Sequence, residues 1–393
     1  MAVTCSSVSL RVRDRTADAF WSKVLVRAER VHSGECSAHV TRLERLPRII
    51  DQETCCARFG DRATMVLMGN GERRERTRNS TAAAREAHCW FAVDRVAGDR
   101  ASTAWKRAAR LHQARWRLAN DYPIGAQPYA GGPDATPVGS RLNLRFAREI
   151  GANLLTAGAK LAARRRLEAP EPHQTLLETR LWADLLSSMP LCFNLFGELA
   201  TDPVSAAKSV AAWWPDVPRG VVQVRFEHSP GRRDTAFLGN RSAFDVAFEI
   251  AAGDALAVIG VEVKYHEHAV AELVPRAAAL ARYIEVSERS GVFRPSWRAE
   301  LVGTDLQQIW LDHLLLLSML QHPSRRWSSG RFVLAYPKRN TSYDAAARRY
   351  QAVLRDSATF EARTLEELVS LYGGPQTTIA LLRERYLAVS LDE

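Results

Sequence analysis

Residues 242–265 read SAFDVAFEIAAGDALAVIGVEVKY, and this stretch indicates two strands joined by a tight turn. Both arms are rich in Val, Ile, Phe and Ala, a composition that suits largely buried strands. Gly253 and Asp254 stand between the arms as the two central residues of a hairpin loop, and glycine in the first position suits a type II′ turn. Ala252 is then expected to pair with Ala255.

Counting outward from this loop places Asp245 of the first strand opposite Glu262 of the second, unless a bulge shifts the register. Glu262 and Lys264 are two residues apart, so they project from the same face of their strand. Directly opposite residues also share a face, and Asp245, Glu262 and Lys264 are therefore expected to form one cluster. The apolar neighbours are expected on the other side: Phe244, Val246, Phe248 and Ile250 in the first strand, and Ile259, Val261 and Val263 in the second.

Two carboxylates side by side raise the pKa of one of them unless a positive charge neutralises the pair. A hard divalent cation such as Mg²⁺, or Mn²⁺ in its place, accepts carboxylate, carbonyl, water and phosphate oxygens. Lys264 beside such an ion could orient or deprotonate the attacking water, or stabilise charge on a phosphate. The alternative interpretation is an ordinary salt-bridged strand pair. We favour catalysis because these charges interrupt an otherwise apolar strand, with an acid directly opposite.

The pattern of Asp245, sixteen further residues and then Glu262-Val263-Lys264 resembles the PD-(D/E)XK motif of restriction endonucleases and related DNA-processing nucleases. Phe244 stands where the name of the superfamily has proline. The fuller pattern is similar to a group of bacterial restriction-endonuclease-like proteins over roughly residues 100–393. The segments that carry the resemblance are LSSMPLCFNLFGEL (186–199), FEHSPGRRD (226–234), SAFD (242–245), GVEVKY (260–265) and QQIWLDHL (307–314).

The resemblance implies an α/β fold with a restriction-endonuclease-like core, in which helices flank a mixed central sheet and extra helices precede it. It also implies that Asp245 and Glu262 bind the metal, with the Val263 carbonyl as a further ligand, and that Lys264 is the catalytic lysine. Glu178, near the start of the helix expected before the strands, matches an acid that some members carry there. A first-turn glutamate that merely favours the helix dipole is the alternative.

The segment from Glu227 to Asp234 supplies secondary candidates. Glu227 ends an expected strand and could join the metal site. Arg232 and Arg233 follow in a polar loop and could contact the DNA backbone. A polar turn without a ligand is the alternative interpretation of this loop.

The long apolar helix expected over residues 306–319 begins with two glutamines. Gln307, or its neighbour Gln308, could contact a metal-bound water or a phosphate from this helix. An exposed helix glutamine with no role in the site is the other interpretation.

The whole chain has 393 residues, a net charge of +10 and a pI of about 9.6. A basic protein attracts polyanions, and DNA is therefore an expected partner. No apolar run reaches the roughly 18 residues of a membrane span, and no secretory signal is recognisable at the N-terminus. Six scattered cysteines fit reduced thiols better than a disulfide framework. These features predict a cytoplasmic protein without a membrane anchor.

Composition also suggests where the chain divides. Residues 1–85 are rich in Arg, Ser and Thr without a sustained period, and we expect a poorly ordered or loosely packed N-terminal extension there. Residues 86–393 are expected to form the nuclease domain, with an N-terminal helical part over about 100–170 and a catalytic core over about 174–340.

The sequence as a whole predicts a metal-dependent endonuclease that hydrolyses DNA phosphodiester bonds in restriction-type defence against foreign DNA. A homodimer and a cognate methyltransferase encoded nearby are further expected partners. Two alternatives stay open: a catalytically inactive nucleic-acid-binding module on the same fold, and a nuclease that acts on RNA or on structured DNA.

Overall fold

The structure, a computed structural model, describes most of the chain after residue 81 and three strands before it. The described residues are 7–11, 23–30, 36–40, 82–89, 104–126, 136–174, 176–220 and 222–390. The chain divides into two units, Met1–Arg73 and Arg74–Glu393. In the first unit, β1 (Ser7–Arg11), β2 (Lys23–Arg30) and β3 (Cys36–Val40) form an antiparallel sheet in that order. The expected extension over residues 1–85 lies mostly outside the described residues and stays a prediction.

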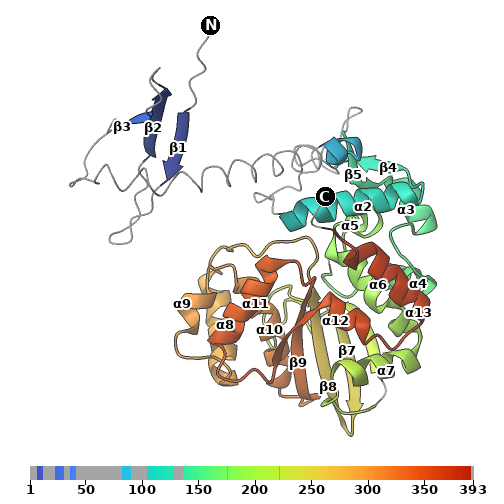
Figure 1. Cartoon of the computed structure of the whole chain (residues 1–393). Helices are drawn as coiled ribbons and strands as arrows, with labels where there is room; N and C mark the ends of the chain where they lie inside the picture. The colour runs from blue at the N-terminus through green and yellow to red at the C-terminus, as the bar shows by residue number, and fades with distance from the viewer. Residues whose placement is uncertain are drawn as a thin grey trace. The chain divides into compact units, whose positions relative to one another are not determined.

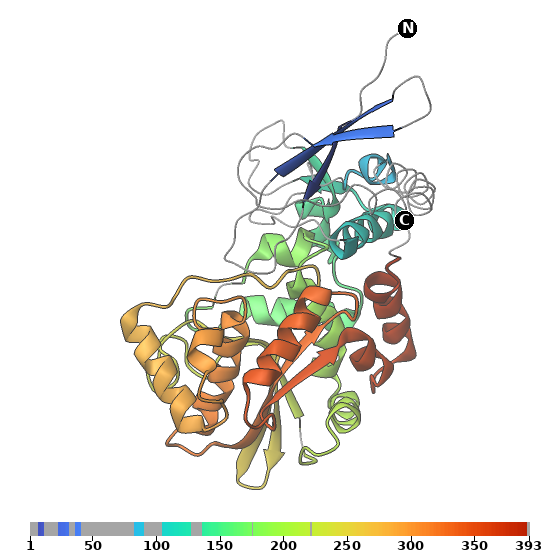
Figure 2. The same cartoon turned by 60° about the vertical axis from the view of Figure 1, so that its left-hand side comes forward.

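A five-stranded mixed sheet forms the centre of the second unit, in the order β10-β9-β8-β7-β6. The pairs β6–β7 and β7–β8 are antiparallel, whereas β8–β9 and β9–β10 are parallel. Helices flank the sheet (Figures 1 and 2), and this arrangement confirms the α/β fold class expected from the sequence. The strands are β6 (Val222–His228), β7 (Phe244–Ala252), β8 (Ala255–Val263), β9 (Trp327–Tyr336) and β10 (Phe360–Thr364).

One face of the sheet is covered mainly by helices that precede it in the chain. Helix α6 (Ser188–Thr201) contacts β6, β7 and β8. Its Phe193 ring stacks on Phe226 with the ring centres 4.3 Å apart, and Phe196 meets Phe248 edge-on at 5.5 Å. Further elements join this layer: α2 (Ala104–Ala119), β4 (Ile124–Ala126), β5 (Pro137–Leu142), α3 (Leu144–Ile150), α4 (Ala157–Glu168), α5 (Glu178–Ala183), α7 (Pro203–Trp213), α12 (Leu365–Ser370), α13 (Gln376–Leu382) and the π-helix η1 (Arg383–Leu387).

The opposite face is covered by helices that follow β8. Helix α10 (Gln307–Leu320) lies along β9 and also contacts β8. It buries an almost continuous apolar surface, in keeping with its run of leucines. The same layer contains α8 (Ala277–Ser290), α9 (Trp297–Leu301) and α11 (Thr341–Val353). Within the described residues, none of the helices is long and apolar enough to cross a membrane.

The β7–β8 hairpin has the register that the turn residues predicted. Ala252 pairs with Ala255, and the ladder runs without a shift to Val246 opposite Val261. Gly253 has a φ of 64° and Asp254 has no positive φ, as a type II′ turn requires. This register places Asp245 opposite Glu262 one step beyond the last regular pair.

The prediction that Phe244 lies on the same face of the sheet as Val246 is wrong. Strict alternation would put Phe244 beside Val246, yet Val246 packs with the α6 layer and Phe244 packs with the α10 layer. The reason is a break in the β6–β7 ladder, which pairs residues 226 and 228 of β6 but not Glu227 between them. Beyond this break the Phe244 ring lies over Gly260, where a Cβ atom would be only 2.4 Å from Phe244 Cε1.

We predict that Gly260→Ala lowers the free energy of unfolding by about 1–3 kcal/mol, because the added methyl group must displace a ring in a closely packed layer. Urea denaturation followed by tryptophan fluorescence would measure the change. Ala251→Val adds carbon to the same hairpin at an exposed position and serves as the control. An unchanged midpoint in Gly260→Ala would contradict the packing described here.

Candidate active site

The ends of three neighbouring strands bring acidic residues together. Asp245 is the second residue of β7, and Glu262 and Glu227 are the penultimate residues of β8 and β6. Because β6 and β8 both run antiparallel to β7, their C-terminal ends lie beside its N-terminal end. Lys264 follows β8 directly. Glu262 and Lys264 are 8% and 7% exposed, so these charges are largely removed from water.

Asp245 contacts the main chain of β8 at the point where the regular ladder ends. Its Oδ2 atom accepts a hydrogen bond from the Val263 N–H at 2.7 Å. In an antiparallel ladder the N–H and C=O of one residue project toward the same neighbouring strand. The Val263 carbonyl therefore projects toward Asp245, which is the position that the expected third ligand requires.

Lys264 and Gln308 both bind one oxygen of Glu262. The Lys264 Nζ atom donates to Glu262 Oε1 at 2.6 Å, and the Gln308 amide donates to the same oxygen at 3.2 Å. Lys264 also lies 5.8 Å from the centre of the Tyr343 ring, within the range of a cation–π contact. One oxygen of this carboxylate therefore carries both the lysine and the glutamine.

Two carboxyl groups of this cluster, those of Asp245 and Glu227, have raised pKa values. Burial raises the pKa of Asp245 well above its usual range, and the charges of Glu262 and Glu227 raise it further. Burial and Glu262 raise the pKa of Glu227 to about 7. Burial opposes the charge of Lys264, but the attraction of Glu262 outweighs it and raises the pKa of Lys264. A single lysine thus leaves the acids short of positive charge, which a divalent cation would supply.

The donor set fits a hard cation. Mg²⁺ binds through one or two carboxylates and keeps several positions for water and phosphate oxygens, and Asp245, Glu262 and the Val263 carbonyl meet that description. In the described part of the chain, no three acidic, histidine or cysteine side chains form a ready-made metal-binding group. Two carboxylates and one carbonyl would leave further positions of such a cation to water and substrate oxygens.

Comparison with known proteins agrees with this geometry. A family model described as the PD-(D/E)XK nuclease superfamily matches residues 99–388, which is most of the chain. The chain belongs to the PD-(D/E)XK nuclease superfamily. No curated protein and no solved structure matches it. Membership confirms the resemblance seen in the sequence and indicates a nuclease.

Helix α10 of this nuclease contributes Asp312, a residue that the sequence reasoning missed. Asp312 lies one turn after Gln308 and is 8% exposed. Burial raises the pKa of Asp312 well above its usual range, and the neighbouring charge of Glu262 adds to this. A signal was present in the sequence, because Gln308 and Asp312 stand four residues apart, on one helix face, in an otherwise apolar run.

Gln307 has a different role from the one expected. Gln307 is only 3% exposed, so it is not the exposed helix glutamine of the alternative interpretation. Its side-chain Oε1 atom accepts a hydrogen bond from the Gly303 N–H at 2.7 Å. Its amide donates to the Glu272 carboxylate and to the Leu273 carbonyl oxygen. Gln307 therefore holds the loops beside α10, and Gln308 is the glutamine that reaches Glu262.

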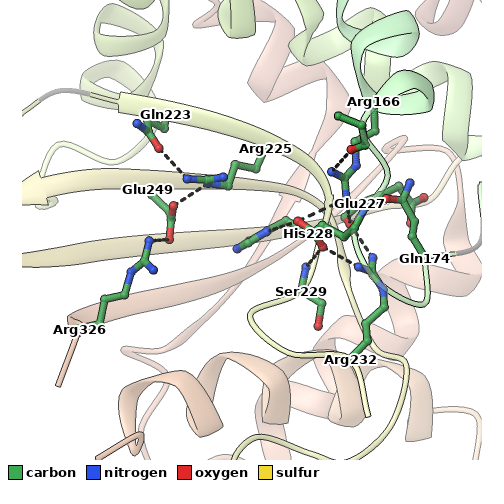
Figure 3. A network of polar contacts seen from close by, with 12 residues as sticks. Arg166, Gln174, Gln223, Arg225, Glu227, His228, Ser229, Arg232, Glu249 and Arg326 are labelled. Atoms are coloured by element: carbon green, nitrogen blue, oxygen red, sulfur yellow. Dashed lines mark hydrogen bonds and ion pairs between the residues drawn. The ribbon is translucent and has the colours of Figure 1, made fainter. Parts of the chain in front are cut away.

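Arg232 is part of a polar network (Figure 3), and contacts to the Glu171 carboxylate form its centre. The Glu171 carboxylate accepts from Arg232 at 2.5 Å, from the Ser229 N–H at 3.0 Å and contacts His228 Nδ1 at 2.7 Å. Arg166 pairs with the same carboxylate at 3.3 Å. The Arg232 side chain is only 3% exposed, so the structure places it inside the protein rather than on a surface that meets the DNA backbone.

This network also holds the main chain of Glu227. Arg166 and Arg232 both donate to the Glu227 carbonyl oxygen, at 3.1 and 2.5 Å. Glu227 has a φ of 47°, a left-handed conformation that is strained for a residue with a side chain. Two arginines thus stabilise the bend that separates Glu227 from the β6–β7 ladder and leaves its carboxylate within electrostatic range of Glu262.

The other two secondary candidates lie on the surface. Arg233 is exposed, which is compatible with a contact to nucleic acid. Glu178 forms an ion pair with Arg148 of α3 at 3.2 Å, and both side chains are substantially exposed. Arg180, two residues further along α5, is the one whose charge reaches Glu227.

We predict that Glu171→Gln lowers the free energy of unfolding by about 2–3 kcal/mol at neutral pH, because it leaves two buried arginines without their carboxylate. Burial opposes ionisation of Glu171, but His228, Ser229 and Arg166 lower its pKa from 4.5 to about 2. Because the pKa of Glu171 is lower in the folded protein, its ionised carboxylate stabilises the fold at any pH above the ordinary pKa of 4.5. This contribution disappears as the pH falls from 4.5 toward 2.

Urea denaturation of wild type and variant between neutral and acidic pH would test this. The difference between the two proteins should shrink on acidification. Glu285→Gln removes an exposed carboxylate that pairs with Arg282 and should have little effect at any pH. A difference that is the same in acid as at neutral pH would contradict the assigned role of Glu171.

Proposed function

We propose that this protein is a metal-dependent endonuclease that hydrolyses DNA phosphodiester bonds. The observation that carries the proposal is the convergence of Asp245 and Glu262 at the ends of β7 and β8, with Lys264 bonded to Glu262 at 2.6 Å. Membership of the PD-(D/E)XK nuclease superfamily supports the same reaction class. The net charge of +10 favours a polyanionic substrate.

Asp245, Glu262 and the Val263 carbonyl would hold Mg²⁺ or Mn²⁺ in this proposal. The ion would supply positive charge at the scissile phosphate and make the attacking water more acidic. Lys264 has a raised pKa and keeps its proton at neutral pH, so we assign it to stabilising negative charge on the phosphate. Glu227, with a pKa of about 7, is suited to accept the proton of the water.

The biological role that we propose is restriction-type defence against foreign DNA in the cytoplasm. The similarity of five sequence segments to bacterial restriction-endonuclease-like proteins supports it. One centre of this kind cuts one strand, so a homodimer would suit a double-strand cut. A cognate methyltransferase encoded nearby would protect the host's own DNA.

We predict that the purified protein cleaves DNA with Mg²⁺ or Mn²⁺, and that Asp245→Ala and Glu262→Ala reduce cleavage to the level seen with a chelator. A plasmid library with mapped ends is the best substrate, because a sequence-specific enzyme needs its site to be present. Glu285→Gln is a matched control at an exposed position. RNA and branched DNA should compete poorly if duplex DNA is the substrate.

Cleavage that persists in both the Asp245→Ala and the Glu262→Ala variants would contradict this mechanism. Salt-sensitive DNA binding without metal-dependent heat in calorimetry would instead favour an inactive binding module.

We predict that cation binding releases protons near neutral pH. The raised pKa of Asp245, and that of Glu227 at about 7, mean that these groups carry protons in the metal-free protein at or below neutrality. A cation must displace these protons, so its affinity should fall as the pH falls through about 7.

Mn²⁺ titration calorimetry in two buffers with different ionisation enthalpies would detect the released protons. The heats should differ between the buffers at pH ~6.5, and the difference should shrink as the pH rises. Equal heats in both buffers at the lower pH would show that the carboxylates are already ionised.

A further inference from the structure

A cation and Lys264 would compete for Glu262. The Lys264 ammonium group is bonded to Glu262 Oε1 at 2.6 Å, and the lysine is only 7% exposed. An ammonium group that loses its partner in such a place finds little water to replace it. Without a second acceptor within reach of Lys264, a cation that binds Glu262 would leave the buried ammonium group unpaired. The cost of that unpaired charge would lower the affinity for the cation.

Asp312 has the properties of that acceptor. It lies on α10, four residues after Gln308, and residues four apart share a helix face. Gln308 donates to Glu262 Oε1, so this face of α10 is turned toward the Lys264–Glu262 pair. The Asp312 Oδ2 atom is buried and has no hydrogen-bond partner among the described residues. A buried carboxylate in this state needs a positive partner.

The other acid near Lys264 is already engaged. Glu267 accepts a hydrogen bond from the Ser188 hydroxyl at 2.7 Å through Oε1. Its Oε2 atom accepts from the Tyr265 N–H, also at 2.7 Å. The free oxygen of Asp312 distinguishes it from Glu267.

We propose that Asp312 is the second counter-ion of Lys264. In the metal-free protein the ammonium group pairs with Glu262, and when a cation occupies Glu262 the ammonium group moves to Asp312. The lysine stays charged throughout, and Asp312 releases its proton to solvent as the ammonium group arrives. Asp312 is then a positioning residue: it keeps a counter-ion beside the catalytic lysine while Glu262 binds the cation. The inference rests on the proposed function, since it requires a cation at Glu262.

The test measures Mn²⁺ affinity of the full chain by titration calorimetry, without any cleavage assay. Asp312→Asn should weaken Mn²⁺ binding about tenfold, in the range found for residues that support metal ligands. Asp305→Asn is the matched control, because Asp305 lies just before α10 and pairs with Arg349 on the surface. The Asp305→Asn variant should bind Mn²⁺ with the affinity of the wild type. Asp312→Leu provides a second neutral variant if the asparagine variant does not fold.

The decisive comparison repeats Asp312→Asn in a Lys264→Met background. Without the lysine there is no ammonium group to relocate, so loss of Asp312 should have no further effect on Mn²⁺ affinity. A loss of affinity that persists in this background would mean that Asp312 binds the cation itself, and would overturn the proposal. Wild-type affinity in Asp312→Asn would overturn it as well.

Glu262→Ala separates this inference from the proposed function. Mn²⁺ binding that survives Glu262→Ala would overturn the metal centre and the inference together. Binding that is lost in Glu262→Ala but unaffected by Asp312→Asn would overturn the inference alone. The melting temperature of the metal-free Asp312→Asn variant should not fall, because the substitution breaks no hydrogen bond of the buried Oδ2 atom.

Discussion

The hydrogen bond from the Val263 N–H to the Asp245 carboxylate lies where the β7–β8 ladder stops, and the positions of the other charged groups depend on it. It brings a side chain of β7 against the main chain of β8, so that one carboxylate and one carbonyl face the same small region. Glu262 and Lys264 flank Val263 in the chain and are therefore brought to the same place. A shift of one residue in the hairpin would turn both to the opposite face of the sheet.

Two acids of the same strand show why we regard one of them as functional. Glu249 of β7 is 3% exposed, yet its pKa is lowered despite burial, because Trp327 and Arg225 bind its carboxylate. Figure 3 shows the contact with Arg225. Asp245, at the other end of β7, has a raised pKa because it is buried and its neighbours Glu262 and Glu227 are further acids. A compensated acid stabilises the fold, whereas an uncompensated one leaves a place for a cation.

Arg166 and Arg232 support the main chain beside the site. Arg166 and Arg232 are held by Glu171, and together they bind the main chain of the strained Glu227. A residue in a left-handed conformation persists only where its surroundings determine it. This network thus supports one acid of the proposed centre through ion pairs within the protein.

The two strands, the type II′ turn and the register that sets Asp245 against Glu262 and Lys264 were determined by the sequence itself. They depend on a period of two and on a glycine in the loop, both of which are local properties of the chain. Four other features were decided only by the tertiary structure: the face of Phe244, the burial of Arg232, the choice of Gln308 over Gln307, and the place of Asp312 beside Lys264. They depend on contacts between segments far apart in the chain, or on a break in a strand ladder. The spacing of residues along one strand or helix predicts neither of these.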